Sequence, residues 1–124
     1  MRVSEIIEYV NMVDPNQFDT ATKIGWLSDL DAKVFETVIL THEHEECIEY
    51  LPYTQLDDEL LIKEPYAKDC YEPYLRAKMS AANLEAVRYN QHMAMFNGAY
   101  QVFTNYYNRT HRPLAAAGGN RFRF

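Results

Sequence analysis

The sequence contains few cysteines and no long apolar run, and each absence excludes a class of protein. Two cysteines, Cys47 and Cys70, are too few for a disulfide framework in a chain of 124 residues. No stretch approaches the ~18 apolar residues of a transmembrane helix, and residues 1–5 lead into an acidic amphipathic run rather than the apolar region of a signal peptide. We therefore expect a single domain in a reducing cytoplasm, with no membrane partner.

Motifs for catalysis and cofactor binding are also missing. The four glycines, Gly25, Gly98, Gly118 and Gly119, form no phosphate-binding loop. There is no glycine-flanked serine elbow, and neither cysteine lies in a redox or protease motif. Carboxylates are numerous, but the sequence alone cannot pair them into an acid–base site. We expect a protein that is not an enzyme and binds no cofactor.

The strongest candidate for metal binding is the segment around His42 and His44, which also contains acidic residues and Cys47. Residues two apart on a helix point about 200° away from each other, so these histidines cannot share one ion there. The zincin spacing of four is absent as well. We expect no metal site and interpret the histidines as the C-terminus of a helix, where they suit the negative end of its dipole.

The charge is unevenly distributed along the chain. The net charge is −6, yet the last 16 residues hold no acid and four arginines: Arg109, Arg112, Arg121 and Arg123. Removing these four positive charges from the total leaves −10 on the preceding 108 residues. An acidic body disfavours general binding of nucleic acid. The basic end could contact the acidic body of another copy, or it could be a solvated terminus.

Helical periodicity dominates the pattern, so we predict a mainly α fold, a small helical bundle. Ser4 is a plausible N-cap for a first helix over residues 5–13, which Asp14-Pro15 ends. A second helix should begin at Asp19 or Thr20 and end near residues 42–44. Between residues 45 and 65 the chain is irregular, and residues 60–62 could form a brief strand or an extended tether.

The longest apolar stripe lies in the C-terminal half. Its members recur at alternating gaps of four and three: Leu75, Met79, Ala82, Ala86, Tyr89, Met93, Phe96, Tyr100, Phe103 and Tyr107. We predict one continuous helix through all of them, roughly 50 Å long, of which one end projects or is covered by neighbouring copies. Because of Pro73, its regular part should start near Glu72, or else a separate turn precedes it. Asn108 to Pro113 should end the helix.

The last residues differ in character from the helical body. We divide the chain into a helical domain over residues 1–113 and an extended C-terminal arm over residues 114–124, with a hinge at Gly118-Gly119. Arg121, Phe122, Arg123 and Phe124 alternate charge and aromatic side chains, a pattern that fits an added β-strand. The chain also has ten tyrosines, a residue type that is favoured at interfaces but is common in ordinary half-buried packing too.

Several stretches resemble a family of small proteins from prophages and tailed phages of Gram-positive bacteria, encoded beside the capsid genes. The resemblance is one of sequence texture over most of the chain. It rests on residues 3–8 (VSEIIE), 23–31 (KIGWLSDLD), 89–90 (YN), 95–97 (MFN) and 106–111 (YYNRTH).

The resemblance implies a head–tail connector, also called an adaptor or head completion protein, found in the virion at the head–tail junction. Such proteins are mostly helical and form a ring, commonly of twelve copies, beneath the portal. The implied partners are the portal, neighbouring copies and a tail or stopper protein, while DNA passes through the ring without sequence-specific binding. By the same resemblance, Arg121 to Phe124 would dock on the portal or a neighbour, and residues 45–62, with Tyr50 and Tyr53, would face a neighbour or the channel.

Two alternatives stay open. A tail-completion or stopper protein would bind below the adaptor, but stoppers tend to be β-rich. A cytoplasmic helical module that pairs with itself through the long stripe would form a stable, finite dimer.

Overall fold

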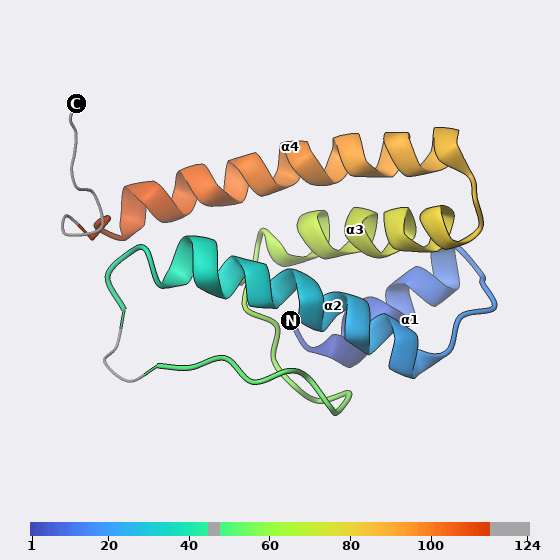
Figure 1. The fold of residues 1–124 in the computed structure, drawn as a ribbon, viewed down its shortest axis with the longest axis horizontal. Helices are drawn as coiled ribbons and strands as arrows, with labels where there is room; N and C mark the ends of the chain where they lie inside the picture. The colour runs from blue at the N-terminus through green and yellow to red at the C-terminus, as the bar shows by residue number, and fades with distance from the viewer. Residues whose placement is uncertain (45–47, 115–124) are drawn as a thin grey trace.

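The structure, a computed structural model, describes residues 1–44 and 48–114. These residues form four α-helices and one π-helical turn, and no strand is present among them (Figure 1). The elements are α1 (Val3–Val13), α2 (Thr20–Val34), η1 (Phe35–Ile39), α3 (Ala67–Ala82) and α4 (Ala86–Thr110). The expected mainly helical bundle with a long C-terminal helix is confirmed. None of the helices within the described ranges is long and apolar enough to cross a membrane.

The first two helices begin close to their predicted positions. α1 starts at Val3, two residues before the predicted start, and the Glu5 carboxylate accepts a hydrogen bond from the Arg2 backbone N–H at 2.8 Å. α2 begins at Thr20, one of the two predicted positions, and the carboxylate of its N-cap residue, Asp19, accepts from the Thr22 N–H at 2.8 Å. η1 continues α2 as far as Ile39, so the helix ends before the predicted end near residues 42–44.

The predicted continuous helix through the long apolar stripe is wrong. The chain turns back at residues 83–85, and α3 and α4 form an antiparallel hairpin (Figure 1). The Leu84 N–H donates to the Ala81 carbonyl at 3.1 Å, and the Glu85 N–H donates to the Ser80 carbonyl at 2.9 Å. This is the Schellman pattern of helix C-termini, with Leu84 in the left-handed region at φ 60°. In the part of the chain that the structure describes, the stripe is thus divided between two helices, and the single projecting helix is not formed.

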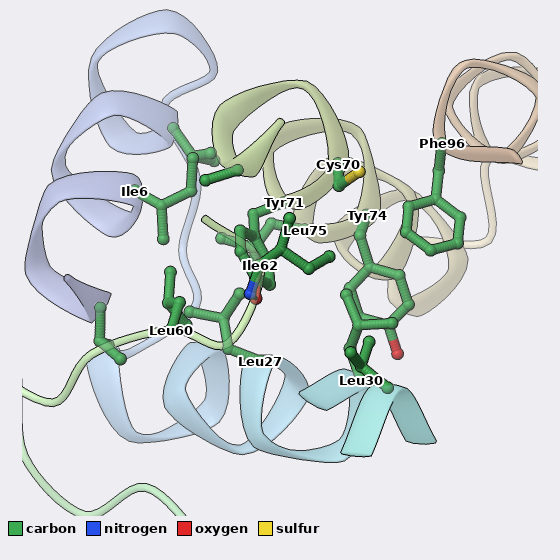
Figure 2. Close-up of a cluster of buried hydrophobic side chains, with 14 of the residues drawn as sticks. Ile6, Leu27, Leu30, Leu60, Ile62, Cys70, Tyr71, Tyr74, Leu75 and Phe96 are labelled. Carbon is green, nitrogen blue, oxygen red and sulfur yellow. Dashed lines mark hydrogen bonds between the residues drawn. The ribbon is translucent and has the colours of Figure 1, made fainter. Parts of the chain in front are cut away.

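α3 is the central layer of the molecule. It packs against α4 on one side and against α1 and α2 on the other (Figure 1). Figure 2 shows Tyr74 of α3 between Leu30 of α2 and Phe96 of α4, and the Tyr74 and Phe96 ring centroids lie 5.2 Å apart. α4 thus forms an outer layer whose main support is a single helix.

α3 begins at Ala67, earlier than the start near Glu72 that Pro73 suggested. Pro73 lies inside the helix and is buried, so its missing N–H falls within the second turn of α3. The possible strand at residues 60–62 is not formed. Leu60 and Ile62 are fully buried, and the Leu60 N–H donates to the Met1 carbonyl at 2.9 Å. An isolated bridge between Arg2 and Glu59 completes the contact.

Candidate functional site

One face of α4 is buried and the opposite face is exposed. The buried residues of this helix are His92, Phe96 and Phe103, and all three point toward the rest of the bundle. The opposite side, which we call the outer face, carries Val87, Gln91, Ala94, Met95, Gly98, Val102 and Asn105. These residues lie on one side of the helix, so they form one continuous surface along about 27 Å of its length.

The outer face lacks the charges that usually cover an exposed helix. Arg88 and Arg109 are the only charged residues in the 25 residues of α4, and they lie near its two ends. Arg88 is bound within the chain, because its guanidinium lies 3.1 Å from Asp14 Oδ2. Burial and the guanidinium groups of Arg76 and Arg88 lower the pKa of His92, so its imidazole stays neutral at neutral pH. The helix is therefore uncharged from Tyr89 to Asn108.

The outer face also exposes apolar side chains and a glycine. Val87 is 71% exposed, Met95 59% and Val102 55%. A Cβ built on Gly98 would meet no atom within 4 Å, so neither packing nor backbone conformation within this chain requires a glycine there. A glycine inside a helix is nevertheless unfavourable by about 1 kcal/mol relative to alanine. Gly25 in α2 is equally unobstructed, but it does not lie on an apolar exposed face.

The turn between α3 and α4 projects a second apolar feature. Leu84 is 90% exposed, and Val87 follows it at the start of α4. We call these two residues the hairpin knob. Leucine is an unusual choice at the left-handed position of a Schellman turn, where glycine is normal. The knob therefore combines a strained backbone with a large apolar side chain in solvent.

The other end of α4 borders a cavity of about 520 Å³. We call it the aromatic groove; its walls include Ile48, Tyr66, Phe103, Tyr106, Tyr107 and His111. The Tyr66 and Tyr106 ring centroids lie 4.8 Å apart, and the Tyr107 and His111 rings stack at 3.9 Å. The groove has the size and apolar lining of a ligand or side-chain pocket.

His42 connects the end of η1 to the C-terminal part of α4. Its Nε2 lies 2.6 Å from the Asn108 side-chain oxygen, and its Nδ1 lies 2.6 Å from the Val38 carbonyl oxygen. His44 Nδ1 lies 2.6 Å from the His42 carbonyl oxygen. The two imidazoles thus bind different partners. Within residues 1–44 and 48–114, no group of three or more His, Cys, Asp or Glu side chains could hold a metal ion.

Tyr50 and Tyr53 are half-buried against α2. The Tyr50 hydroxyl donates to the Ser28 carbonyl at 2.8 Å, and the Tyr53 hydroxyl donates to Asp31 Oδ2. Their rings therefore help to hold the 48–62 segment onto the bundle. Their predicted contact with a neighbouring subunit stays a prediction.

Asp31 is a buried carboxylate that the sequence reasoning missed. It is completely inaccessible to solvent and accepts from Tyr53, from the Tyr71 hydroxyl at 2.7 Å and from the Leu61 N–H at 3.0 Å. Burial raises its pKa, although the three donors oppose the shift. Two of these donors belong to the 48–62 segment and the third belongs to α3, so Asp31 holds both against α2. The sequence did contain one signal of this buried site, because Asp31 lies within the apolar stripe of α2.

Arg121, Phe122, Arg123 and Phe124 lie outside the described residues, so their docking role also stays a prediction. No protein-family model, curated protein or solved structure matches this chain. Its interaction surfaces are therefore the basis for assigning a function.

Proposed function

We propose that this chain is a structural subunit of a phage head–tail junction, a ring-forming adaptor that binds beneath the portal, completes the head and joins it to the tail. It acts without catalysis, in the virion and in the host cytoplasm during assembly. The observation that carries the proposal is the uncharged, partly apolar outer face of α4, on a helix supported from one side only.

Exposing such a face to water is unfavourable, and burying it against another protein surface is favourable. A surface helix normally carries charged residues opposite its core-facing stripe. Interface cores, by contrast, are depleted in charge and enriched in apolar side chains such as methionine. Val87, Met95 and Val102 on the outer face follow the second pattern. A neighbouring subunit or the portal would supply the missing cover, and Gly98 would permit close approach of its backbone.

The charge distribution fits a conduit for DNA. An acidic body repels phosphate, so DNA can pass through a ring of these subunits without being held. In this proposal, Arg121 to Phe124 bind the portal or a neighbouring copy, and the tail or a stopper protein binds the opposite side of the ring. The helical fold favours an adaptor over a stopper, because stoppers tend to be β-rich.

Negative-stain microscopy of this protein mixed with the portal from the same genome tests the proposal. We expect an additional ring on one face of the portal, whose symmetry gives the copy number. The alternative function, a helical module that pairs with itself, uses the same outer face. Bare portal rings, with this protein running as a discrete dimer, would contradict the adaptor assignment and favour that module.

A further inference from the structure

Leu84 is held in a conformation that its own chain gives no reason to select. Its φ of 60° lies in the left-handed region, which disfavours every side chain with a Cβ. Its side chain is 90% exposed, so burial within the chain does not compensate for the strain. Glycine would close the same turn without either disadvantage. Because the strain at Leu84 brings no advantage within the chain, it indicates that Leu84 contacts another molecule.

The aromatic groove, at the opposite end of α4, has an apolar lining that matches the apolar side chains of the knob. The hairpin knob lies at the start of α4, and the aromatic groove borders the last turns of the same helix. The groove volume of about 520 Å³ exceeds what a leucine side chain needs, and the lining is mostly aromatic and aliphatic. The helix keeps the two features roughly 30 Å apart, so one copy cannot join its own knob to its own groove.

We propose that the aromatic groove of one copy receives the hairpin knob, Leu84 and Val87, of a second copy. A knob at one end and a groove at the other produce a head-to-tail contact, which closes into a ring when the rotation permits. The proposal rests on the ring-forming function above and names the contact between its subunits.

The charges beside the two features are consistent with a second copy as the occupant. Glu85 lies between the two knob residues, where it pairs with Arg88 of its own chain at 3.4 Å, and Lys63 lines the groove, so a carboxylate would arrive beside an ammonium group. Two aliphatic side chains and their surroundings bury much less than the ~1,200 Å² of a stable interface. A single contact is therefore weak, and a closed ring, in which every copy makes two, is stronger.

Complementary variants test the proposal without the portal. Leu84→Arg removes the knob and keeps the groove; Ile48→Arg obstructs the groove and keeps the knob. In analytical ultracentrifugation, we expect wild-type protein to associate beyond a dimer as its concentration rises, and each variant alone to associate about tenfold more weakly or worse. An equimolar mixture should form a 1:1 pair that cannot extend, because only one intact knob and one intact groove can meet. Association of either variant as strong as that of wild type, or no pairing in the mixture, would overturn the proposal.

A second knob variant separates loss of contact from loss of fold. Leu84→Gly should raise the melting temperature, since it relieves the turn, and should weaken association as Leu84→Arg does. Unchanged association of this more stable variant would contradict the proposal. Leu51→Ser, at a leucine that is 69% exposed but belongs to neither feature, is the matched control and should associate like wild type.

Residues 121–124, with two phenylalanines, are the competing occupant of the groove. If the groove receives the knob of a second copy, deleting residues 115–124 should not strengthen association between copies. A gain in association would assign the groove to these residues of the same chain and overturn the proposal. An added ring on the portal, together with failure of the mixing experiment, would keep the adaptor function and reject this contact alone.

Discussion

The hydroxyl of Tyr71 in α3 donates to Asp31 Oδ1 in α2 at 2.7 Å and accepts from the Ile62 backbone N–H at 2.9 Å. One oxygen atom of α3 therefore hydrogen-bonds both to α2 and to the segment over residues 48–62, which we call the crossing segment. Burial, together with the Asp31 charge, raises the pKa of Tyr71, so this hydroxyl keeps its proton. The contact fixes the segment after residue 48 against the core.

Tyr71→Phe should destabilise the fold by about 1–3 kcal/mol, because it removes one donor from a buried carboxylate and leaves the buried Ile62 N–H without its acceptor. Urea unfolding followed by circular dichroism measures the change. Tyr9→Phe is the matched control: among the described residues the Tyr9 hydroxyl makes no hydrogen bond, and the Lys68 ammonium lies over its ring at 3.7 Å in either case. Equal effects of the two substitutions would contradict the structural role of Tyr71.

Because of Asp31, the free energy of unfolding should fall as the pH rises. An ion-paired aspartate has the opposite effect, since it makes the free energy of unfolding rise with pH. Its folded pKa is raised above the ordinary value of 3.8, mainly by burial. Above pH 3.8 the folded chain therefore binds more protons at this site than the unfolded chain, and stability falls as the pH rises through the folded pKa. Asp31→Asn lacks this dependence. The stability of wild type relative to Asp31→Asn, measured by urea unfolding, should thus decrease from pH 4 toward neutrality; a constant difference would refute the prediction.

Gly98 and Gly25 offer a matched pair for testing the outer face of α4. Both are helical, and both have open space where a Cβ would lie. Replacing either by Gln should raise the stability of the isolated chain by about 0.5–1 kcal/mol. Gly98→Gln should reduce ring formation on the portal, and Gly25→Gln should not. If the two variants form rings equally well, the outer face is not an interface.

Leu84→Gly should stabilise the isolated chain by about 1 kcal/mol, since glycine adopts a φ of 60° without strain. Thermal unfolding at low protein concentration keeps association out of the measurement. Asn83→Gly provides the neighbouring control. Its φ of −88° gives glycine no advantage, and the Asn83 side-chain oxygen accepts from Gln17 at 2.7 Å. We expect this control to lose stability; a gain there would show that the turn responds to glycine generally.

Deleting residues 120–124 should leave cooperative unfolding unchanged, because no helical apolar stripe of the sequence passes through these residues. The same deletion should weaken binding to the portal, as measured by co-sedimentation. Loss of cooperative melting would contradict the first expectation, and undiminished portal binding would reject the docking arm.

The sequence predicted the helices well where side-chain chemistry repeats locally. Asp19 signalled the start of α2, and the apolar stripe located both partners of the α3–α4 hairpin. The turn between them was missed for a specific reason: the Schellman position holds Leu84, so the usual glycine signal is absent. The stripe stays in phase across the turn because Leu75 in α3 and Phe96 in α4 both face the interior of the bundle.

The contacts of the crossing segment could not be predicted in the same way. Asp31 and Tyr71 are 40 positions apart, and no local pattern pairs them. The aspartate within the apolar stripe of α2 did indicate a buried polar site, but not its donors. The outer face of α4 was visible only as the side opposite the stripe, since exposure of Met95 and Val102 depends on which helices cover α4.

The π-helical turn η1 makes its helix tolerant to the loss of one residue. The Leu40 N–H donates to the Phe35 carbonyl at 2.9 Å, so this turn holds one residue more than an α-turn would. Deleting one residue between 35 and 39 would let the backbone close as a regular α-helix. Because the wide turn already absorbs that one residue, the residues after it would keep nearly the same positions, and His42 would still reach Asn108. The same deletion in a regular α-helix would instead rotate every later residue by about 100°.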